Sequence, residues 1–240
     1  MATGTGHAEL SCTRAILARA VSVSRGGSGP AYGRAVTSID VYADILCPFA
    51  HLGLRSVVRR RNELGRGAVV VRVRAWPLEL VNGKPVDART TAEHADALRT
   101  QVASDLFAHF DPDHFPESSL PALALAAAAY RRGDTTGEAV SLALRDALFE
   151  EGRDISDPDV LASVANAHGV GRRVADDDDA VQREWQEGTC RGVEGSPHFF
   201  CGQVEAFCPS LDIAKDGDGE LHIRRNVETL DAFLAECFKL

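Results

Sequence analysis

Long hydrophobic runs and an excess of positive charge are both missing from this 240-residue sequence. The longest apolar stretch, Leu120 to Tyr130, is shorter than the roughly 18 to 20 consecutive apolar residues that a spanning helix needs. Lys and Arg number 26 against 35 Asp and Glu, so the formal charge is -9 and the chain repels phosphate backbones and anionic membranes. We therefore expect no membrane and no nucleic acid among its partners.

Paired cysteine motifs are also missing. The six cysteines follow no regular spacing and form no C-x-x-C pair: Cys12, Cys47, Cys190, Cys201, Cys208 and Cys237. Without zinc-type spacing, these thiols and His198 do not predict a metal site. Without a secretory signal, reduced thiols in the cytoplasm are a better interpretation than a disulfide framework.

The length and composition fit one large domain, or one domain that carries an insertion. Apolar residues make up 45% of the chain, enough for a full core. Residues 1–37 are rich in Gly, Ser and Arg, and we interpret them as a disordered extension or the product of an upstream start codon, with a transit segment as the alternative. We assign residues 38–240 to the folded domain, with a helical insertion at about 88–175.

The periodicity of the chain predicts the order of elements. From Ser38, "SIDVYADIL" reads as a buried strand, residues 48–64 as a helix, and "AVVVRVRAWPLEL" from Ala68 as a second strand. A helix over 91–110 and a block of further helices follow, the last at 177–189. An aromatic strand near residue 199, a strand in "LHIRR" and a closing helix in "VETLDAFLAECF" complete the order β-α-β, helical insertion, α-β-β-α.

Cys47 lies where the first strand meets the first helix. Unpaired backbone N–H groups and the positive end of the helix dipole at such a position stabilise a thiolate, so we expect a lowered pKa and a nucleophilic thiol. The alternative is a small buried core residue, since free cysteines are often buried.

A second candidate segment, "GVEGSPHFF", lies about 150 residues later. A cis bond before Pro197 is accessible at this X-Pro step and would expose the backbone N–H and C=O of Ser196 to an extended substrate. The alternative is an ordinary turn before a strand.

Together, "CPFAHLGL" and "GVEGSPHFF", in this order and separation, resemble the DsbA-like branch of the thioredoxin superfamily, especially its FrnE-like cytosolic members. The resemblance implies a thioredoxin-like α/β fold with an inserted α-helical domain. It implies that Cys47 is the attacking thiol and that Pro197 is a cis-proline facing it. We place the substrate-binding surface at Pro48, Phe49, Ser196, Pro197 and His198.

One position departs from the redox-active members of that family, because Ala50 stands where C-x-x-C carries its second cysteine. Three interpretations remain open: an external low-molecular-weight thiol resolves the mixed disulfide, another cysteine (Cys190, Cys201 or Cys208) does so, or the chemistry has left disulfide exchange. The related 2-hydroxychromene-2-carboxylate isomerases and kappa-class glutathione transferases carry serine where Cys47 stands and hold a glutathione thiolate.

Our first interpretation is a monothiol thiol-disulfide oxidoreductase that acts on a disulfide- or thiol-containing substrate. It holds no tightly bound cofactor and uses a low-molecular-weight thiol as co-substrate. His51 is a candidate proton donor or thiolate partner, with an ordinary helix histidine as the alternative. A thiol-dependent isomerase or transferase and a non-catalytic thioredoxin-fold binding protein are the alternative functions, and a homodimer stays open.

Overall fold

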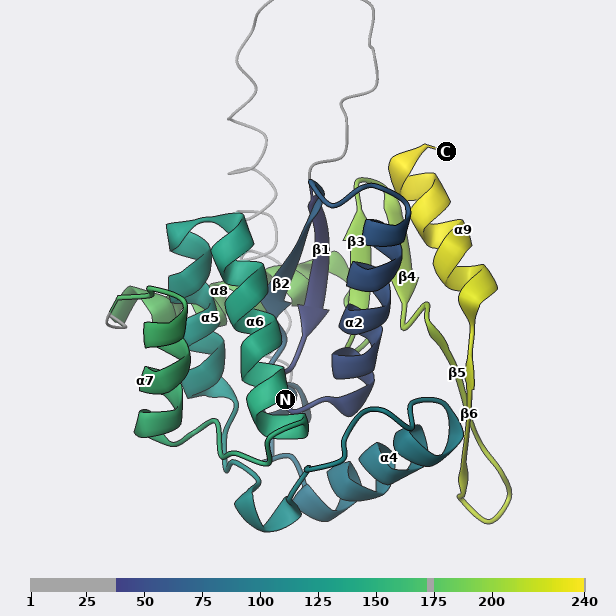
Figure 1. Cartoon of the computed structure of the whole chain (residues 1–240), viewed down its shortest axis with the longest axis horizontal. Helices are drawn as coiled ribbons and strands as arrows, with labels where there is room; N and C mark the ends of the chain where they lie inside the picture. Colours follow the sequence, from purple (N-terminus) through teal and green to yellow (C-terminus); the bar gives the residue numbers. More distant parts are fainter. Residues whose placement is uncertain (1–37, 172–174, 240) are drawn as a thin grey trace, which may run out of the picture.

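The computed structural model describes residues 38–171 and 175–239, so the extension expected at 1–37 lies outside the described residues. A four-stranded sheet stands at the centre with helices on both of its faces (Figure 1). Its strands, in order across the sheet, are β2 (Val70–Ala75), β1 (Ser38–Ala43), β3 (His198–Cys201) and β4 (Val204–Phe207).

The register of β1 explains why this strand is central. Val41 pairs in parallel with Val73 of β2 and antiparallel with Phe199 of β3. Ile39, Val41 and Ala43 have no exposed surface, because helices cover the face on which they stand. The parallel pairing of β1 and β2 requires a crossover, and the helix α2 (Pro48–Glu63) provides it, which confirms the expected β-α-β start.

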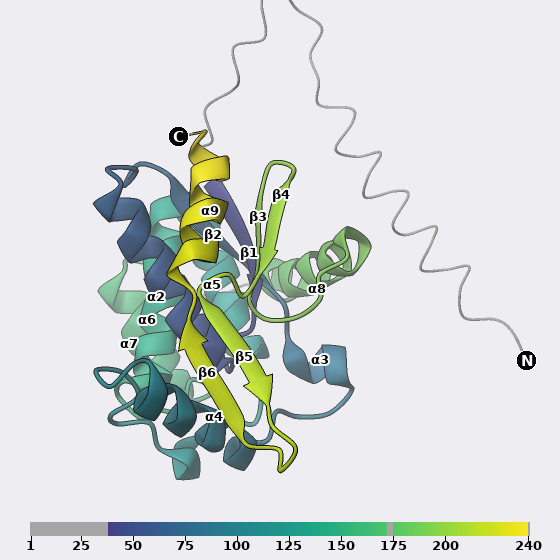
Figure 2. The same cartoon turned by 90° about the vertical axis from the view of Figure 1, so that its right-hand side faces the viewer.

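Different helices cover the two faces of the sheet (Figure 2). On one face, α2 and the closing helix α9 (Val227–Phe238) enclose Val41 and Phe199. On the other face, Tyr42, Trp76 and Phe200 pack together beneath Trp185 of α8 (Ala175–Arg191). The alternation along each strand therefore separates two apolar layers.

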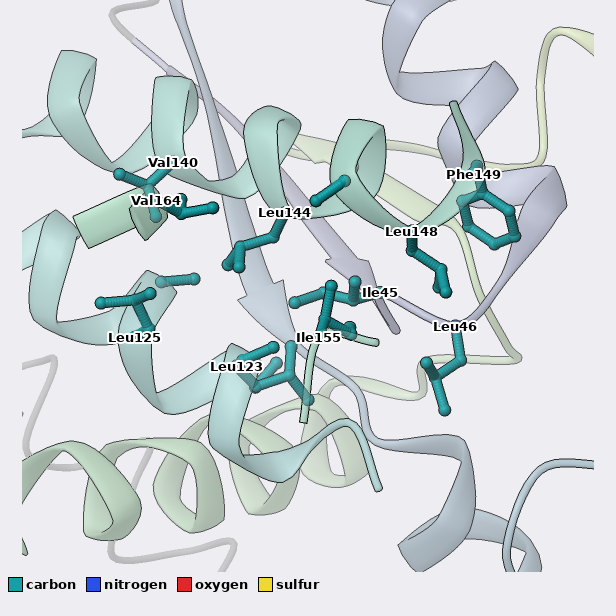
Figure 3. Packing of buried hydrophobic residues seen from close by; sticks show 14 of the residues in the cluster. Ile45, Leu46, Leu123, Leu125, Val140, Leu144, Leu148, Phe149, Ile155 and Val164 are labelled. Atoms are coloured by element: carbon teal, nitrogen blue, oxygen red, sulfur yellow. The ribbon is translucent and has the colours of Figure 1, made fainter. Parts of the chain in front are cut away.

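The segment between β2 and α8 is helical and contributes to the larger of the apolar cores. Figure 3 shows Leu144 and Leu148 pointing toward Ile45 and Leu46, which follow β1, so this core reaches the start of α2. In chain order its helices are α3 (Leu78–Asn82), α4 (Ala88–Gln101), η1 (Pro112–His114), α5 (Leu120–Arg132), α6 (Asp134–Phe149) and α7 (Pro158–Ala167). Among the described residues, no helix is both long and apolar enough to span a membrane.

The helix predicted over 91–110 is wrong in extent. α4 begins at Ala88, where the Asp87 carboxylate caps it by accepting the Thr90 N–H, and it ends at Gln101. Farther on, the Phe107 N–H donates to Glu150 Oε2 at 3.1 Å, and Phe107 has a left-handed φ of 62°. A contact with a residue 43 positions away thus replaces the helical bond, and local periodicity cannot reveal it.

The strands after α8 also differ from the predicted α-β-β-α order. "HFFCGQVEAF" forms two strands, β3 and β4, joined by a tight turn in which Gly202 has a φ of 66°. The strand expected in "LHIRR" is β6 (Leu221–Arg225), which pairs with β5 (Leu211–Lys215) in a separate two-stranded sheet. Gln101 of α4 bonds Leu221 and Ile223, which attaches this second sheet to the helical segment.

Candidate active site

Cys47 is the residue that immediately precedes α2. Its backbone is extended (φ -88°, ψ 112°) and its C=O accepts the His51 N–H at 3.1 Å, so Cys47 is the N-cap of the helix. Pro48 occupies the first helical turn, where a missing N–H is tolerated. The predicted strand-to-helix position of the thiol is therefore confirmed.

The second predicted segment meets this thiol. The Ser196–Pro197 peptide bond is cis, as the sequence predicted, and the Cys47 thiol donates to the Ser196 carbonyl oxygen at 3.1 Å. Ser196 Oγ accepts the Asp44 N–H at 3.0 Å. Because the Ser196 hydroxyl is the acceptor in this contact, its proton remains available to the Cys47 sulfur. The hydroxyl interacts with that sulfur and lowers the pKa of the thiol.

The pKa expected for Cys47 is wrong in direction. Cys47 is 5% exposed, and burial raises the pKa of its thiol, with a smaller contribution from the nearby Asp44 carboxylate. The Ser196 hydroxyl and the backbone N–H groups of Ala50 and Phe49 lower the pKa, as a helix N-terminus should, but they do not offset the burial. At neutral pH the resting thiol is therefore protonated and surrounded by three donors suited to a thiolate.

Asp44 is a site residue that the sequence analysis missed. It has no exposed surface, and its two carboxylate oxygens accept the N–H groups of Leu46 (3.0 Å) and Leu78 (2.5 Å). Burial raises the pKa of this carboxyl, although those hydrogen bonds and the Arg145 cation oppose the shift. An acidic residue inside the apolar run "YADIL" is the signal that would have identified it.

Arg145 of α6 is the cation of this site, and the sequence analysis missed it too. The side chain is fully buried and donates to the Ser141 O, the Ser141 Oγ and the backbone O of Asp44, at 2.8, 2.7 and 3.1 Å. Burial lowers its pKa to about 10, while the Asp44 charge, and the Cys47 charge once that thiol ionises, oppose the shift. The guanidinium thus stays charged at neutral pH and interacts with both acidic groups.

Position 50 offers the attacking thiol no partner sulfur, because it is an alanine. Ala50 is fully buried in the first turn of α2. Cys208 lies close by, because its N–H donates to the Pro197 carbonyl at 3.0 Å. Burial and the neighbouring Cys47 raise the pKa of Cys208 to about 12. At neutral pH the Cys208 thiol is therefore protonated, which makes this cysteine a poor resolving group.

The two candidate histidines do not lie at the thiol. His51 has no exposed surface, its Nε2 lies 2.6 Å from Glu150 Oε1, and its ring packs against Phe107 and Phe149. Burial lowers its pKa, so the ring is neutral. His51 thus belongs to the helical core, and its predicted catalytic role has no geometric support.

His198 faces the layer beneath α8 rather than α2. Its Nδ1 accepts the Glu194 N–H at 3.2 Å, and its ring stacks on Phe200 with centroids 4.3 Å apart. The predicted substrate contact of His198 therefore has no geometric support either, because the ring supports the cis-proline loop from behind.

Of the remaining predicted residues, Pro48 is buried at the start of α2. Phe49 is half-buried, and its ring lies 5.2 Å from that of His94 in α4. Phe49 therefore lies between the thiol and the helical segment. Within residues 38–171 and 175–239, no group of three or more His, Cys, Asp or Glu side chains gathers to hold a metal ion.

Comparisons with solved structures agree with this architecture. The fold resembles 2-hydroxychromene-2-carboxylate isomerase (16% identity, TM-score 0.54, 71% of this chain and 88% of that one covered). It also resembles the cytosolic disulfide reductase DsbM from Pseudomonas aeruginosa (18%, 0.53, 83% and 96%), which has also been solved with GSH. A third similar structure is a provisionally named protein disulfide isomerase from Nitrosomonas europaea (14%, 0.58, 85% and 98%).

No curated protein matches the chain. The model of the DSBA-like thioredoxin domain does match it, over residues 38–215, a span that contains β1, Cys47, the helical segment and the Ser196–Pro197 loop. The thioredoxin-like fold and the resemblance given by "CPFAHLGL" and "GVEGSPHFF" are thereby confirmed, and the chain belongs to the DSBA-like thioredoxin family.

Proposed function

We propose that this protein is a cytoplasmic thiol-disulfide oxidoreductase that works through Cys47 alone and uses an external low-molecular-weight thiol. The observation that carries the proposal is the contact between the Cys47 thiol and Ser196 O beside the cis-Pro197, with alanine at position 50. The similarity to a cytosolic disulfide reductase solved with GSH supports the compartment and the class of co-substrate. The homodimer stays a prediction.

The exchange proceeds in two balanced steps. The Cys47 thiolate attacks one sulfur of the substrate disulfide, the S–S bond breaks, and the other sulfur leaves as a thiolate that takes up a proton. An external thiolate then attacks the mixed disulfide and frees Cys47, carrying away the substrate sulfur as a new disulfide. Each cycle therefore consumes one disulfide and one thiol and produces another of each.

Substrate docking and ionisation of Cys47 both depend on one atom, the Ser196 carbonyl oxygen. Ser196 O accepts the Cys47 thiol in the free protein, and the same oxygen is the acceptor that an extended substrate would use through its own backbone N–H. A substrate that takes this acceptor removes a hydrogen bond that favours the protonated thiol. The Ser196 hydroxyl and the N–H groups of Phe49 and Ala50 are then available to the thiolate.

The test is trapping of the mixed disulfide. We expect incubation with a glutathionylated peptide to add one thiol adduct at Cys47, detected by intact mass and peptide mapping, and excess glutathione to remove it. The adduct should be lost in Cys47→Ser and kept in the matched control Cys208→Ser. The rate of release should rise in proportion to the concentration of glutathione. Release that is independent of glutathione, or an adduct that persists in Cys47→Ser, would contradict the proposal.

A second candidate function is a thiol-dependent isomerase or transferase. The three donors around the Cys47 sulfur favour it, because they would hold the thiolate of a bound low-molecular-weight thiol equally well. In this case glutathione-dependent turnover of an organic substrate would survive Cys47→Ser, since serine preserves a hydroxyl at that position. Loss of all turnover in Cys47→Ser favours disulfide exchange instead.

A further inference from the structure

Two more cysteines face each other at the end of the sheet opposite to Cys47. Cys201 is the last residue of β3, and it is 3% exposed. β3 runs antiparallel to β1, and its residue Phe200 pairs with Asp40 near the start of β1. Cys47 follows the other end of β1, so Cys201 does not belong to the site described above.

Cys237 lies in the last turn of α9 and is 2% exposed. Its position repeats that of Leu230, Phe233 and Leu234, so it lies on the face of α9 that packs on the sheet. Figures 1 and 2 both show α9 lying beside the β3–β4 strands.

The register between β3 and α9 brings the two cysteines together. Phe199 of β3 contacts Phe233 of α9, with ring centroids 6.0 Å apart. Two residues along a strand advance about 6.7 Å and four residues along a helix advance about 6 Å. Cys201 and Cys237 therefore lie at similar distances along their elements from the phenylalanine pair, each on the same face as its phenylalanine.

The two thiols belong to the same buried cluster, and each influences the pKa of the other. Their interaction lowers the pKa of Cys201 and raises that of Cys237. Cys201 is thus the sulfur that ionises first, and Cys237 supplies a second thiol beside it.

We propose that Cys201 and Cys237 are a second redox site of this protein, which a low-molecular-weight disulfide such as oxidised glutathione converts into an intramolecular disulfide. The bond ties the C-terminal helix to the sheet and encloses β4, β5 and β6 in a covalent loop. The site is independent of Cys47 and of the proposed disulfide exchange there.

Both steps of the oxidation balance. The Cys201 thiolate attacks oxidised glutathione, its S–S bond breaks, one glutathione thiolate leaves, and Cys201 carries the other as a mixed disulfide. Cys237 then loses its proton and attacks the Cys201 sulfur, which releases the second glutathione as a thiol. Two protein thiols are oxidised and one glutathione disulfide is reduced. Access comes from the last turn of α9, because helix ends open at little free-energy cost.

The test is oxidation of the full-length folded chain in buffers of stepped reduced-to-oxidised glutathione ratio. Free thiols are then blocked and the protein is digested without reduction. We expect a peptide pair linked through Cys201 and Cys237, both in the wild type and in Cys47→Ser. The pair should be missing from Cys201→Ser and from Cys237→Ser. It should remain in Cys208→Ser, a matched loss of another buried thiol.

Thermal unfolding provides the second readout. A disulfide that fits the native geometry raises the midpoint relative to the reduced form, by about 5 °C or more for a loop and chain of this size. Mixed glutathione adducts without a linked pair, or a pair that forms only in urea, would overturn the proposal. Because Cys47→Ser is included, loss of the linked pair in this variant alone would assign the oxidation to Cys47 and also overturn it.

Discussion

Replacing Ser196 by alanine tests how the resting thiol is controlled. Ser196→Ala removes the hydroxyl that stabilises the Cys47 thiolate and leaves the Asp44 N–H without its acceptor. A hydrogen bond to a charged group contributes about 1.5–3 kcal/mol, and 1.36 kcal/mol corresponds to one pKa unit. The pKa of Cys47 should therefore rise by about 1–2 units above its already raised value.

The reactivity of Cys47 should change by less than its ionisation. Below the pKa, the thiolate fraction falls about 10- to 100-fold for that shift, but a more basic thiolate is intrinsically more nucleophilic. A Brønsted coefficient of about 0.4–0.5 offsets nearly half of the logarithmic loss, so the alkylation rate at neutral pH should fall about 3- to 15-fold.

The assay is the rate of iodoacetamide alkylation of Cys47 between pH 6 and 11, followed by mass spectrometry of its peptide. Ser196→Thr keeps a hydroxyl and should stay close to the wild type. Ser210→Ala is the second control, because Ser210 is buried near Pro197 but its Oγ has no hydrogen-bond partner within the described part of the chain. An unchanged or lowered Cys47 pKa in Ser196→Ala would refute the reasoning.

Three further variants test the buried ionisable residues Asp44, Arg145 and His51. Asp44→Asn removes a negative charge that raises the pKa of Cys47, so its alkylation profile should move to lower pH. Arg145→Met leaves Asp44 buried without its cation and should lower the free energy of unfolding by about 3–5 kcal/mol, measured by urea denaturation. Adding Asp44→Asn to this variant should recover part of the loss. If the effects of the two substitutions on the free energy of unfolding are strictly additive, the two residues are not coupled. Because the buried His51 has a lowered pKa, the unfolded chain binds its proton first, and stability should fall as the pH drops below about 6.5. His51→Gln should flatten this part of the pH profile, and an identical slope in both proteins would count against that assignment.

The parts of the site that the sequence predicted are those set by local chain geometry. Cys47 at a strand-to-helix junction follows from an apolar run, a proline and a helical pattern, all within 20 residues. The Ser196–Pro197 loop follows from an X-Pro step before an aromatic strand. These signals are short-range, and family resemblance supplied the one long-range fact, that the two segments meet.

The missed and mistaken features depend on tertiary packing. Arg145 reaches Asp44 across 101 positions, and its environment is created by the helical core rather than by its neighbours in α6. His51 looked like a partner of Cys47 because it is four residues away, yet Glu150, 99 positions later, holds its ring. The strand prediction near residue 200 failed for a local reason, since the turn at Gly202 divides one apolar run into two strands.

The direction of the Cys47 pKa shows why the position of a thiol does not by itself determine its reactivity. A helix N-terminus supplies favourable donors, but they lower the pKa only if they stabilise the thiolate by more than the free energy lost when the charge leaves water. In this chain the thiol is 5% exposed and a buried carboxylate lies near it, so the two unfavourable effects exceed the favourable ones. The donors are already in place, and Ser196 O holds the proton that has to leave. A substrate that occupies that oxygen lowers the barrier to ionisation at the moment it brings a disulfide to the sulfur, so under the proposed function Cys47 stays unreactive toward solvent oxidants and becomes nucleophilic toward a docked substrate.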